Sequence, residues 1–239
     1  MKNQASLMLD TTGPGLYKRG YRAVGVEAPL RETLAAALVL LSGYRGKDPF
    51  CDPFCGSGTI AIEAALIAKN RAPGLNRTFS AQKWAWLPSQ TWVDGAGEAM
   101  DLEYDGTYDI WGGDIDPAAV HLAQANAVKA DVEDLVHFTQ GDACAFSRQE
   151  PYGRIVCNPP YGERLLDQQM AAQLYRDFGR AVRGLPKGWR VSVLSAHPAF
   201  ERAFGAPADK KRKLYNGMLQ CNLYQYGKKT GVSPKPKAN

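Results

Sequence analysis

Asp52-Pro53-Phe54-Cys55-Gly56-Ser57-Gly58-Thr59 is the stretch that decides the fold. A short strand is predicted around residues 50–52 before it, and a helix over 59–69 after it. Glycines let the backbone turn tightly and approach a ligand, and a helix N-terminus offers unpaired N–H groups. This strand–turn–helix pattern predicts a site for a nucleotide-like ligand. The stretch lacks both the Gly-Lys-Ser/Thr of phosphate-binding loops and the three-glycine spacing of dinucleotide sites, which disfavours those two classes.

Helical and strand periods alternate on both sides of this turn. Helices are predicted over 29–41, with Pro29 at the first position, and over 117–130 and 167–183; strands are predicted over 109–114, 136–140, 154–157 and 190–195. A closing hairpin is predicted over 213–226, with Asn216-Gly217 as its two-residue turn. The alternation predicts an α/β protein with a doubly wound, mostly parallel sheet and a terminal antiparallel hairpin.

The domain organisation predicted from this pattern has three parts. Residues 1–27 form a lead-in segment, 28–227 a single domain, and 228–239 a flexible basic tail. The segment over about 71–107 holds Trp84, Trp86 and Trp92 and is too long for a compact connection, so we interpret it as an insertion with one or two helices. A structural role for its tryptophans is favoured over RNA contact.

Three acidic residues lie at or just after the ends of predicted strands. Asp114 ends the strand 109–114, where a carboxylate can accept both hydroxyls of a ribose. Asp116 is the alternative for the ribose, but Asp114 is favoured because it lies nearer the strand end, and Asp116 is expected to cap the helix that follows it. Asp142, after the third strand, can accept a hydrogen bond from an adenine amino group. Together they extend the nucleotide-like site along one edge of the sheet.

The sequence Asn158-Pro159-Pro160-Tyr161 follows the fourth strand and carries the predicted chemistry. Two prolines make a stiff, extended turn without amide donors. The Asn158 side-chain oxygen and the Pro159 carbonyl can both accept hydrogen bonds from one NH₂ group, holding its lone pair toward an electrophile. Tyr161 offers an aromatic face on which a base can stack. These four residues therefore predict methylation of an exocyclic base amine.

Composition limits the remaining classes. The net charge of +5 is compatible with a polyanionic partner, and basic clusters lie at 18–22, 210–213 and 228–237. Five cysteines without paired spacing and three dispersed histidines predict buried thiols and no metal site. No run reaches the ~18 apolar residues of a membrane helix, so we expect a cytoplasmic protein that binds no membrane. The oligomeric state is left open.

With these motifs, the chain resembles the catalytic domain of the THUMP-containing RNA methyltransferases, and most closely those that make N2-methylguanosine in bacterial 23S ribosomal RNA. The resemblance also rests on Arg19-Gly20-Tyr21-Arg22, Ala28-Pro29-Leu30 and Tyr215-Asn216-Gly217. It implies the seven-stranded class I methyltransferase fold, RNA as partner and S-adenosylmethionine as cofactor. The implied cofactor-binding residues are Asp52, Phe54, Gly56, Gly58, Thr59, Asp114 and Asp142; the implied catalytic residues are Asn158, Pro159, Pro160 and Tyr161.

Three alternatives to a methyltransferase acting on guanine N2 of 23S ribosomal RNA are considered. A tRNA guanine-N2 methyltransferase shares the same fold, and a nucleic-acid adenine-N6 enzyme shares the Asn-Pro-Pro-Tyr logic but not the Arg-Gly-Tyr-Arg segment. A non-catalytic RNA-binding module is disfavoured because the acceptor motif is intact. Related enzymes carry a THUMP region before the catalytic part and the larger ones a second methyltransferase domain, so we expect this chain alone to bind RNA weakly.

Overall fold

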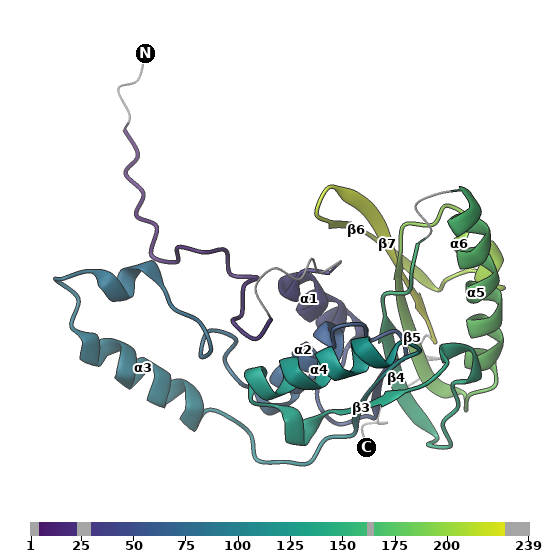
Figure 1. The fold of residues 1–239 in the computed structure, drawn as a ribbon, viewed down its shortest axis with the longest axis horizontal. Coiled ribbons are helices and arrows are strands. Elements are labelled where there is room, and N and C mark those ends of the chain that lie inside the picture. The colour runs from purple at the N-terminus through teal and green to yellow at the C-terminus, as the bar shows by residue number, and fades with distance from the viewer. Residues whose placement is uncertain (1–4, 23–29, 162–164, 228–239) are drawn as a thin grey trace, which may run out of the picture.

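A three-layer α/β/α sandwich with a projecting arm forms the molecule in the computed structural model (Figure 1). The structure describes residues 5–22, 30–161 and 165–227. The predicted tail over 228–239 and the Ala28-Pro29 part of the family resemblance lie outside these ranges. No helix within the described ranges is long and apolar enough to cross a membrane.

Seven strands form one sheet in the order β3-β2-β1-β4-β5-β7-β6. The strands are β1 (Phe50–Asp52), β2 (Ile110–Asp114), β3 (His137–Gln140), β4 (Tyr152–Cys157), β5 (Gly188–Ser195), β6 (Lys210–Asn216) and β7 (Leu219–Tyr226). The first five strands in this order run parallel, β7 is antiparallel to β5, and β6 is antiparallel to β7. The predicted mostly parallel sheet with a terminal hairpin is confirmed. The chain winds outward from β1 to β3 and returns to β4, which places the topological switch point between β1 and β4.

Helices cover both faces of the sheet. One face packs against α1 (Glu32–Ser42), α2 (Thr59–Lys69) and α4 (Pro117–Ala130); the other packs against α5 (Leu165–Arg183) and α6 (Phe200–Phe204). The chain also forms three short 3-10 turns, η1 (Ser80–Lys83), η2 (Glu133–Leu135) and η3 (Ala143–Ala145). Because apolar side chains such as Ile155 and Val156 alternate between the two cores, a short strand anchors both layers.

The predicted element boundaries agree with the structure except at two helix starts, several strand starts and the end of α1, which lies one residue later than predicted. The helix predicted from Pro29 begins at Glu32, because Arg31 is extended, with φ −72° and ψ 144°, and occupies the N-cap. The 5-residue α6 was not predicted from sequence. Helix α5 starts two residues before the predicted Asp167.

The hairpin turn lies one residue later than the sequence suggests. Asn216 pairs with Leu219, so Gly217 and Met218 form the two-residue loop instead of the predicted Asn216-Gly217. Gly217 has φ +63° whereas Met218 is not among the residues with positive φ. Glycine at the first central position is the requirement of a type II′ turn, which explains the shift. Asn216 thereby stays in the strand ladder.

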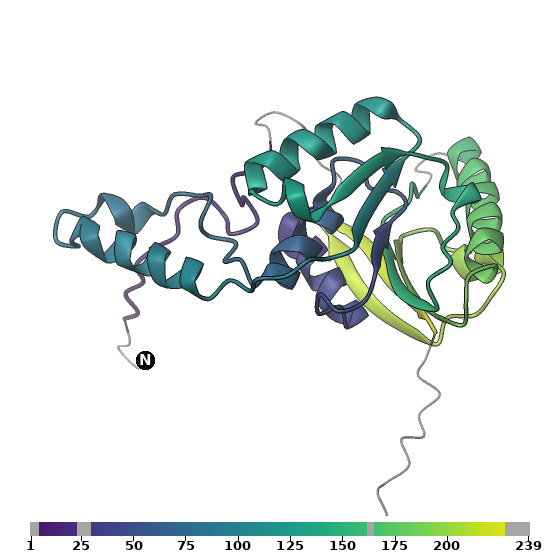
Figure 2. The ribbon, with the colours of Figure 1, turned by 90° about the horizontal axis from the view of Figure 1, so that it is seen from below.

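The arm combines the segment between α2 and β2 with residues 5–22 (Figures 1 and 2). It carries η1 and one α-helix, α3 (Ser89–Asp101), which has no buried residue. The tryptophans pack within the arm: Trp84 stacks on Trp86 and Trp92 on Phe79, with centroids 5.2 Å and 5.6 Å apart. They therefore stabilise the arm's own fold and do not contribute to the main core. The boundary of the insertion at 71–107 stays a prediction.

A buried ionic cluster joins the N-terminal segment to α2. Glu63 accepts hydrogen bonds from Arg19 Nε at 3.3 Å and from the Tyr21 hydroxyl at 3.1 Å. The side chains of Arg19 and Glu63 are only 12% and 2% exposed. Burial raises the pKa of Glu63, and the Arg19 charge opposes that rise. Within the basic cluster over 18–22, Arg19 is therefore not a solvated side chain, whereas Lys18 is exposed.

We expect Arg19→Ala to lower the free energy of unfolding by about 3 kcal/mol, because Glu63 would stay buried without its cation. Arg180→Ala is the matched control: Arg180 is 70% exposed in its ion pair with Asp177, and exposed pairs contribute about 0–1 kcal/mol. Urea unfolding of both variants measures the difference. Equal losses would contradict a structural role for the Arg19–Glu63 pair.

Candidate active site

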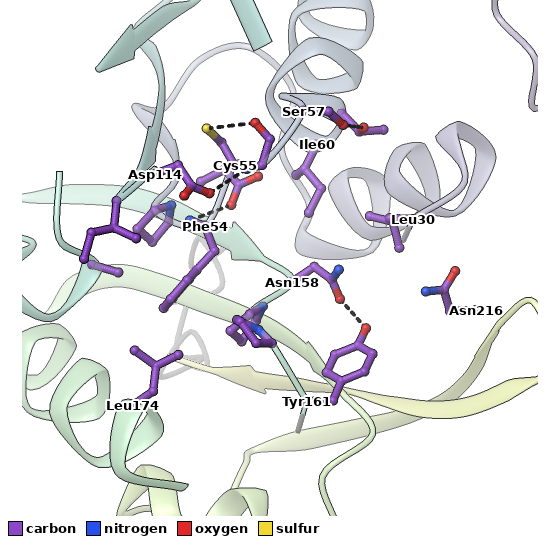
Figure 3. A pocket seen from close by; sticks show the side chains of 18 of the residues that line it. Leu30, Phe54, Cys55, Ser57, Ile60, Asp114, Asn158, Tyr161, Leu174 and Asn216 are labelled. Carbon is purple, nitrogen blue, oxygen red and sulfur yellow. Dashed lines mark hydrogen bonds between the residues drawn. The ribbon is translucent and has the colours of Figure 1, made fainter. Parts of the chain in front are cut away.

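A cavity of about 950 Å³ opens at the switch point between β1 and β4 (Figure 3). Ten of the eleven residues predicted from sequence for the site line it, namely Asp52, Phe54, Gly56, Thr59, Asp114, Asp142, Asn158, Pro159, Pro160 and Tyr161. They come from the ends of β1, β2, β3 and β4. The parallel strands bring motifs more than a hundred positions apart onto one edge, because their carboxyl ends lie side by side.

The glycine turn, Gly56-Ser57-Gly58, is hydrogen-bonded to the end of β2. The Gly56 N–H donates to Asp114 Oδ2 at 2.9 Å, and the Asp116 N–H donates to Asp114 Oδ1 at 3.0 Å. Each carboxylate oxygen has further lone-pair sites, so Asp114 can still accept hydrogen bonds from a ligand. Asp116 accepts from the Ala118 N–H at 2.9 Å, which confirms its predicted role as the cap of α4.

Gly58 is the predicted site residue that does not line the cavity. It has φ +82°, and a Cβ there would meet the Ala123 Cβ and the Phe138 ring at 2.9 Å each. Glycine is thus required by the left-handed turn and by close packing of α2 against α4 and β3. This packing is a sufficient reason for the glycine, and contact with the cofactor stays a prediction for Gly58.

Asp52 is a carboxyl group buried at the floor of the cavity. Its Oδ1 accepts the Phe54 N–H at 3.2 Å, whereas Oδ2 has no hydrogen-bond partner within the described part of the chain. Burial raises its pKa to about 8; the Phe54 hydrogen bond opposes that rise and the Asp114 charge adds to it. A buried acceptor without a partner costs stability unless a ligand satisfies it. Asp52 is therefore suited to a cationic donor.

Hydroxyl groups hold the turn of residues 158–161, called the acceptor turn below, from two sides. The Tyr161 hydroxyl donates to Asn158 Oδ1, as Figure 3 shows. From the other side, the Tyr175 hydroxyl donates to the Pro160 carbonyl at 2.6 Å and lies 3.2 Å from Ser195 Oγ. Burial raises the pKa of Tyr161 and of Tyr175, so both stay protonated donors. The position of the Asn158 amide is thus fixed before any substrate arrives.

Asp142 and Thr59 hold the two remaining corners of the cavity. Asp142 caps η3 by accepting the Cys144 N–H at 2.8 Å, and it is exposed at the rim. Thr59 is the first residue of α2, and its hydroxyl contacts Ser57 Oγ at 3.2 Å and accepts from Arg22. The cavity edge thus combines carboxylates with hydroxyls, as a polar ligand with several donors requires.

Arg22 is a lining residue that the sequence did not assign to the site. Its Nη2 donates to the Leu30 carbonyl at 2.5 Å and to Thr59 Oγ1. Its Nη1 lies 3.6 Å from Glu32 Oε2. Its Nε is buried without a partner in the described ranges. The sequence signal was its place beside Arg19 in the basic cluster, but no local pattern distinguished a lining arginine from a solvated one. Asn216 and Leu219 of the hairpin also line the cavity and were missed.

Comparison with known proteins identifies related chains. Residues 19–225 match the family described as "RMKL-like, methyltransferase domain". "Putative RNA methyltransferase YpsC" of Bacillus subtilis is 44% identical over all of this chain and 62% of its own length. "Ribosomal RNA large subunit methyltransferase K/L" of Vibrio cholerae is 40% identical over 94% of this chain and 33% of its own.

Among solved structures, "SMU.472, a putative methyltransferase complexed with SAH" superposes with a TM-score of 0.86. It is 45% identical over 93% of this chain and 58% of its own. The chain therefore spans less than two thirds of each of these relatives. The THUMP region of the predicted resemblance is not shown by these matches.

Proposed function

This chain belongs to the family of RMKL-like methyltransferase domains, and from that membership we propose that it methylates the exocyclic N2 of guanine in 23S ribosomal RNA. One observation carries the proposal: the Asn158–Tyr161 acceptor turn and the glycine turn of the cofactor motif line the same cavity. The names of the related YpsC and K/L proteins support RNA, and for K/L large-subunit ribosomal RNA, as the substrate.

The cofactor is S-adenosylmethionine, consistent with the family and with the SAH complex of the related structure. The residues present fit it. Asp52 Oδ2, which is buried and has no partner among the described residues, suits the ammonium group, and the buried Arg22 Nε suits the carboxylate. Asp114 can accept ribose hydroxyls and Asp142 the adenine amine. When bound, the cofactor supplies an electrophilic methyl group on a sulfonium.

The protein's own contribution is to prepare the amine. Guanine N2 is a weak nucleophile because its lone pair is delocalised into the ring. Two acceptors, the Asn158 oxygen and the Pro159 carbonyl, would orient that lone pair and stabilise the positive charge that develops on nitrogen. The face of Tyr161 would stack on the base once it has left its helix. In direct transfer the cofactor would leave as the neutral thioether and the methylated nitrogen would lose its extra proton to solvent, so no covalent enzyme intermediate is needed.

Product identification tests this function. The chain is incubated with labelled S-adenosylmethionine and either unmodified 23S ribosomal RNA or tRNA, and the modified nucleoside is identified. We expect label in N2-methylguanosine from the ribosomal RNA. Label in N2-methylguanosine from tRNA would establish tRNA as the substrate. Label in N6-methyladenosine would overturn guanine as the target base. Loss of cofactor binding as well as transfer would exclude the enzyme reading.

A further inference from the structure

The apex of the β6–β7 hairpin lies at the mouth of the cavity. Asn216 and Leu219, which flank the turn, both line the cavity, and Figure 3 shows Asn216 on the side of Tyr161 and Leu30. Between them, Met218 is 100% exposed. Its side chain buries nothing in the fold, although turn positions generally favour polar residues. An apolar side chain is thus presented to solvent beside the acceptor turn.

The strand that leads to this apex is basic. Lys210, Lys211, Arg212 and Lys213 are consecutive and exposed on β6, the edge strand of the sheet. Lys211 is ion-paired with Glu201, whereas Arg212 and Lys213 have no ion-pair partner within the described residues. Lys213 Nζ lies 5.4 Å from the ring centroid of Tyr215, which is 56% exposed. Four consecutive cations, then Leu214 and one exposed aromatic side chain, thus lie along the strand that leads to the cavity.

We propose that the β6–β7 hairpin is the RNA-binding edge of this site, with Arg212 and Lys213 binding phosphates and Met218 filling the space that the target base leaves. The inference rests on the proposed function. A base inside a helix cannot reach the acceptor turn, so it must leave its stack. Methionine is one of the apolar side chains that insert between base steps of a nucleic acid. The cationic side chains of β6 would bind the phosphates of its backbone.

Protection of the sheet edge is the alternative explanation for the lysines. Charged residues on edge strands prevent pairing with other chains. That role needs no particular distance from the cavity, and it accounts for neither the exposed Met218 nor the exposed Tyr215. Met218 lies in the turn between the cavity-lining Asn216 and Leu219, and this position of an exposed apolar side chain is what the RNA-binding role explains.

RNA affinity of charge-reversal variants tests the phosphate contacts. Anisotropy of a fluorescein-labelled, single-stranded RNA of mixed sequence is measured from ~50 to ~200 mM salt. For Arg212→Glu with Lys213→Glu, we expect at least ~10-fold weaker binding and a log–log salt slope smaller by ~1.4, or ~0.7 for each phosphate contact on a single strand. The control, Lys83→Glu with Lys187→Glu, has the same change of charge on exposed residues elsewhere.

Single-turnover methyl transfer to unmodified 23S ribosomal RNA tests Met218. We expect Met218→Ala to slow the step about tenfold and Met218→Leu to restore it, because unstacking a base costs a few kcal/mol and an apolar side chain compensates. The cofactor dissociation constant should stay unchanged in both variants. Met100→Ala, another exposed methionine on the distant α3, is the matched control.

The two ideas fail separately. Equal RNA affinity of the hairpin and control pairs, or normal transfer by Met218→Ala, would overturn the hairpin's role while leaving the methyltransferase function intact. If the unmodified chain neither binds S-adenosylmethionine nor methylates RNA, the proposed function falls. The binding comparison alone then decides for the hairpin: a loss confined to Arg212→Glu with Lys213→Glu supports it, and no difference overturns it.

Discussion

Asn158→Ala is expected to slow methyl transfer to RNA by about 10²–10³-fold, the effect of removing one preorganised group that stabilises developing charge. The side-chain oxygen of Asn158 lies in the cavity, fixed by the Tyr161 hydroxyl. Alanine would remove that acceptor and leave the Pro159 carbonyl alone to orient the amine. Cofactor affinity should be nearly unchanged, because Asp52, Asp114 and the glycine turn are on other strands. Single-turnover transfer and calorimetric cofactor binding measure the two quantities.

Tyr161→Phe is the matched control for this prediction. It keeps the aromatic face but deletes the hydroxyl that donates to Asn158. Because an amide oxygen has two lone pairs, we expect the tyrosine hydroxyl to position Asn158 without replacing it. The variant should therefore lose less than about tenfold in rate, a few tenths to about 1.4 kcal/mol. Unchanged turnover in Asn158→Ala would remove that residue from the mechanism.

Strong local signals explain how much of the fold could be predicted. The helix over 59–69 has the bounds of α2, because glycine precedes it and its apolar residues recur at helical spacing. The position of the site at one edge of the sheet could be predicted from the topology, because parallel strands align their carboxyl ends. Ten of eleven predicted site residues therefore line one cavity, although their roles remain proposals.

Tertiary contacts account for what the sequence did not predict. Arg19 and Arg22 look like a solvated cluster until Glu63 and Glu32 are brought against them. The hairpin turn lies one residue later than predicted. Asn216 pairs with Leu219, and Gly217 takes the first central position of the turn. No local pattern reports a distant partner, so these residues could be placed only from the fold.

Asp52→Asn should weaken cofactor binding by about 10- to 100-fold, corresponding to about 1.5–3 kcal/mol for a hydrogen bond to a charged group. The carboxyl oxygen that has no partner in the described chain would lose the charge proposed to bind the ammonium group. The variant should also unfold at a higher temperature than the unmodified chain above pH 8. Asp101→Asn on the exposed α3 is the control.

The stability effect has a definite sign. Burial raises the pKa of Asp52 from 3.8 to about 8, so folding favours the neutral carboxyl. Its stabilising contribution is fully present below pH 3.8, falls progressively as the pH rises from 3.8, and is lost once the pH has passed the folded pKa of about 8. An asparagine in its place stays neutral, and the variant should lack this loss. Thermal unfolding of the cofactor-free chain across this range measures it.

Cofactor binding should depend on pH in the opposite direction. If the ammonium group binds ionised Asp52, binding below the folded pKa of about 8 must release a proton. Affinity should then rise by up to ~10-fold per pH unit from about 6 to about 7.5, before the ligand's own α-amino group titrates near 7.7–8.0. Asp52→Asn should bind weakly with no such slope. Calorimetry in buffers of different ionisation enthalpy measures the proton release directly. A flat profile for the unmodified chain would mean that the ammonium group binds elsewhere, and that the buried oxygen of Asp52 is satisfied by a neutral donor.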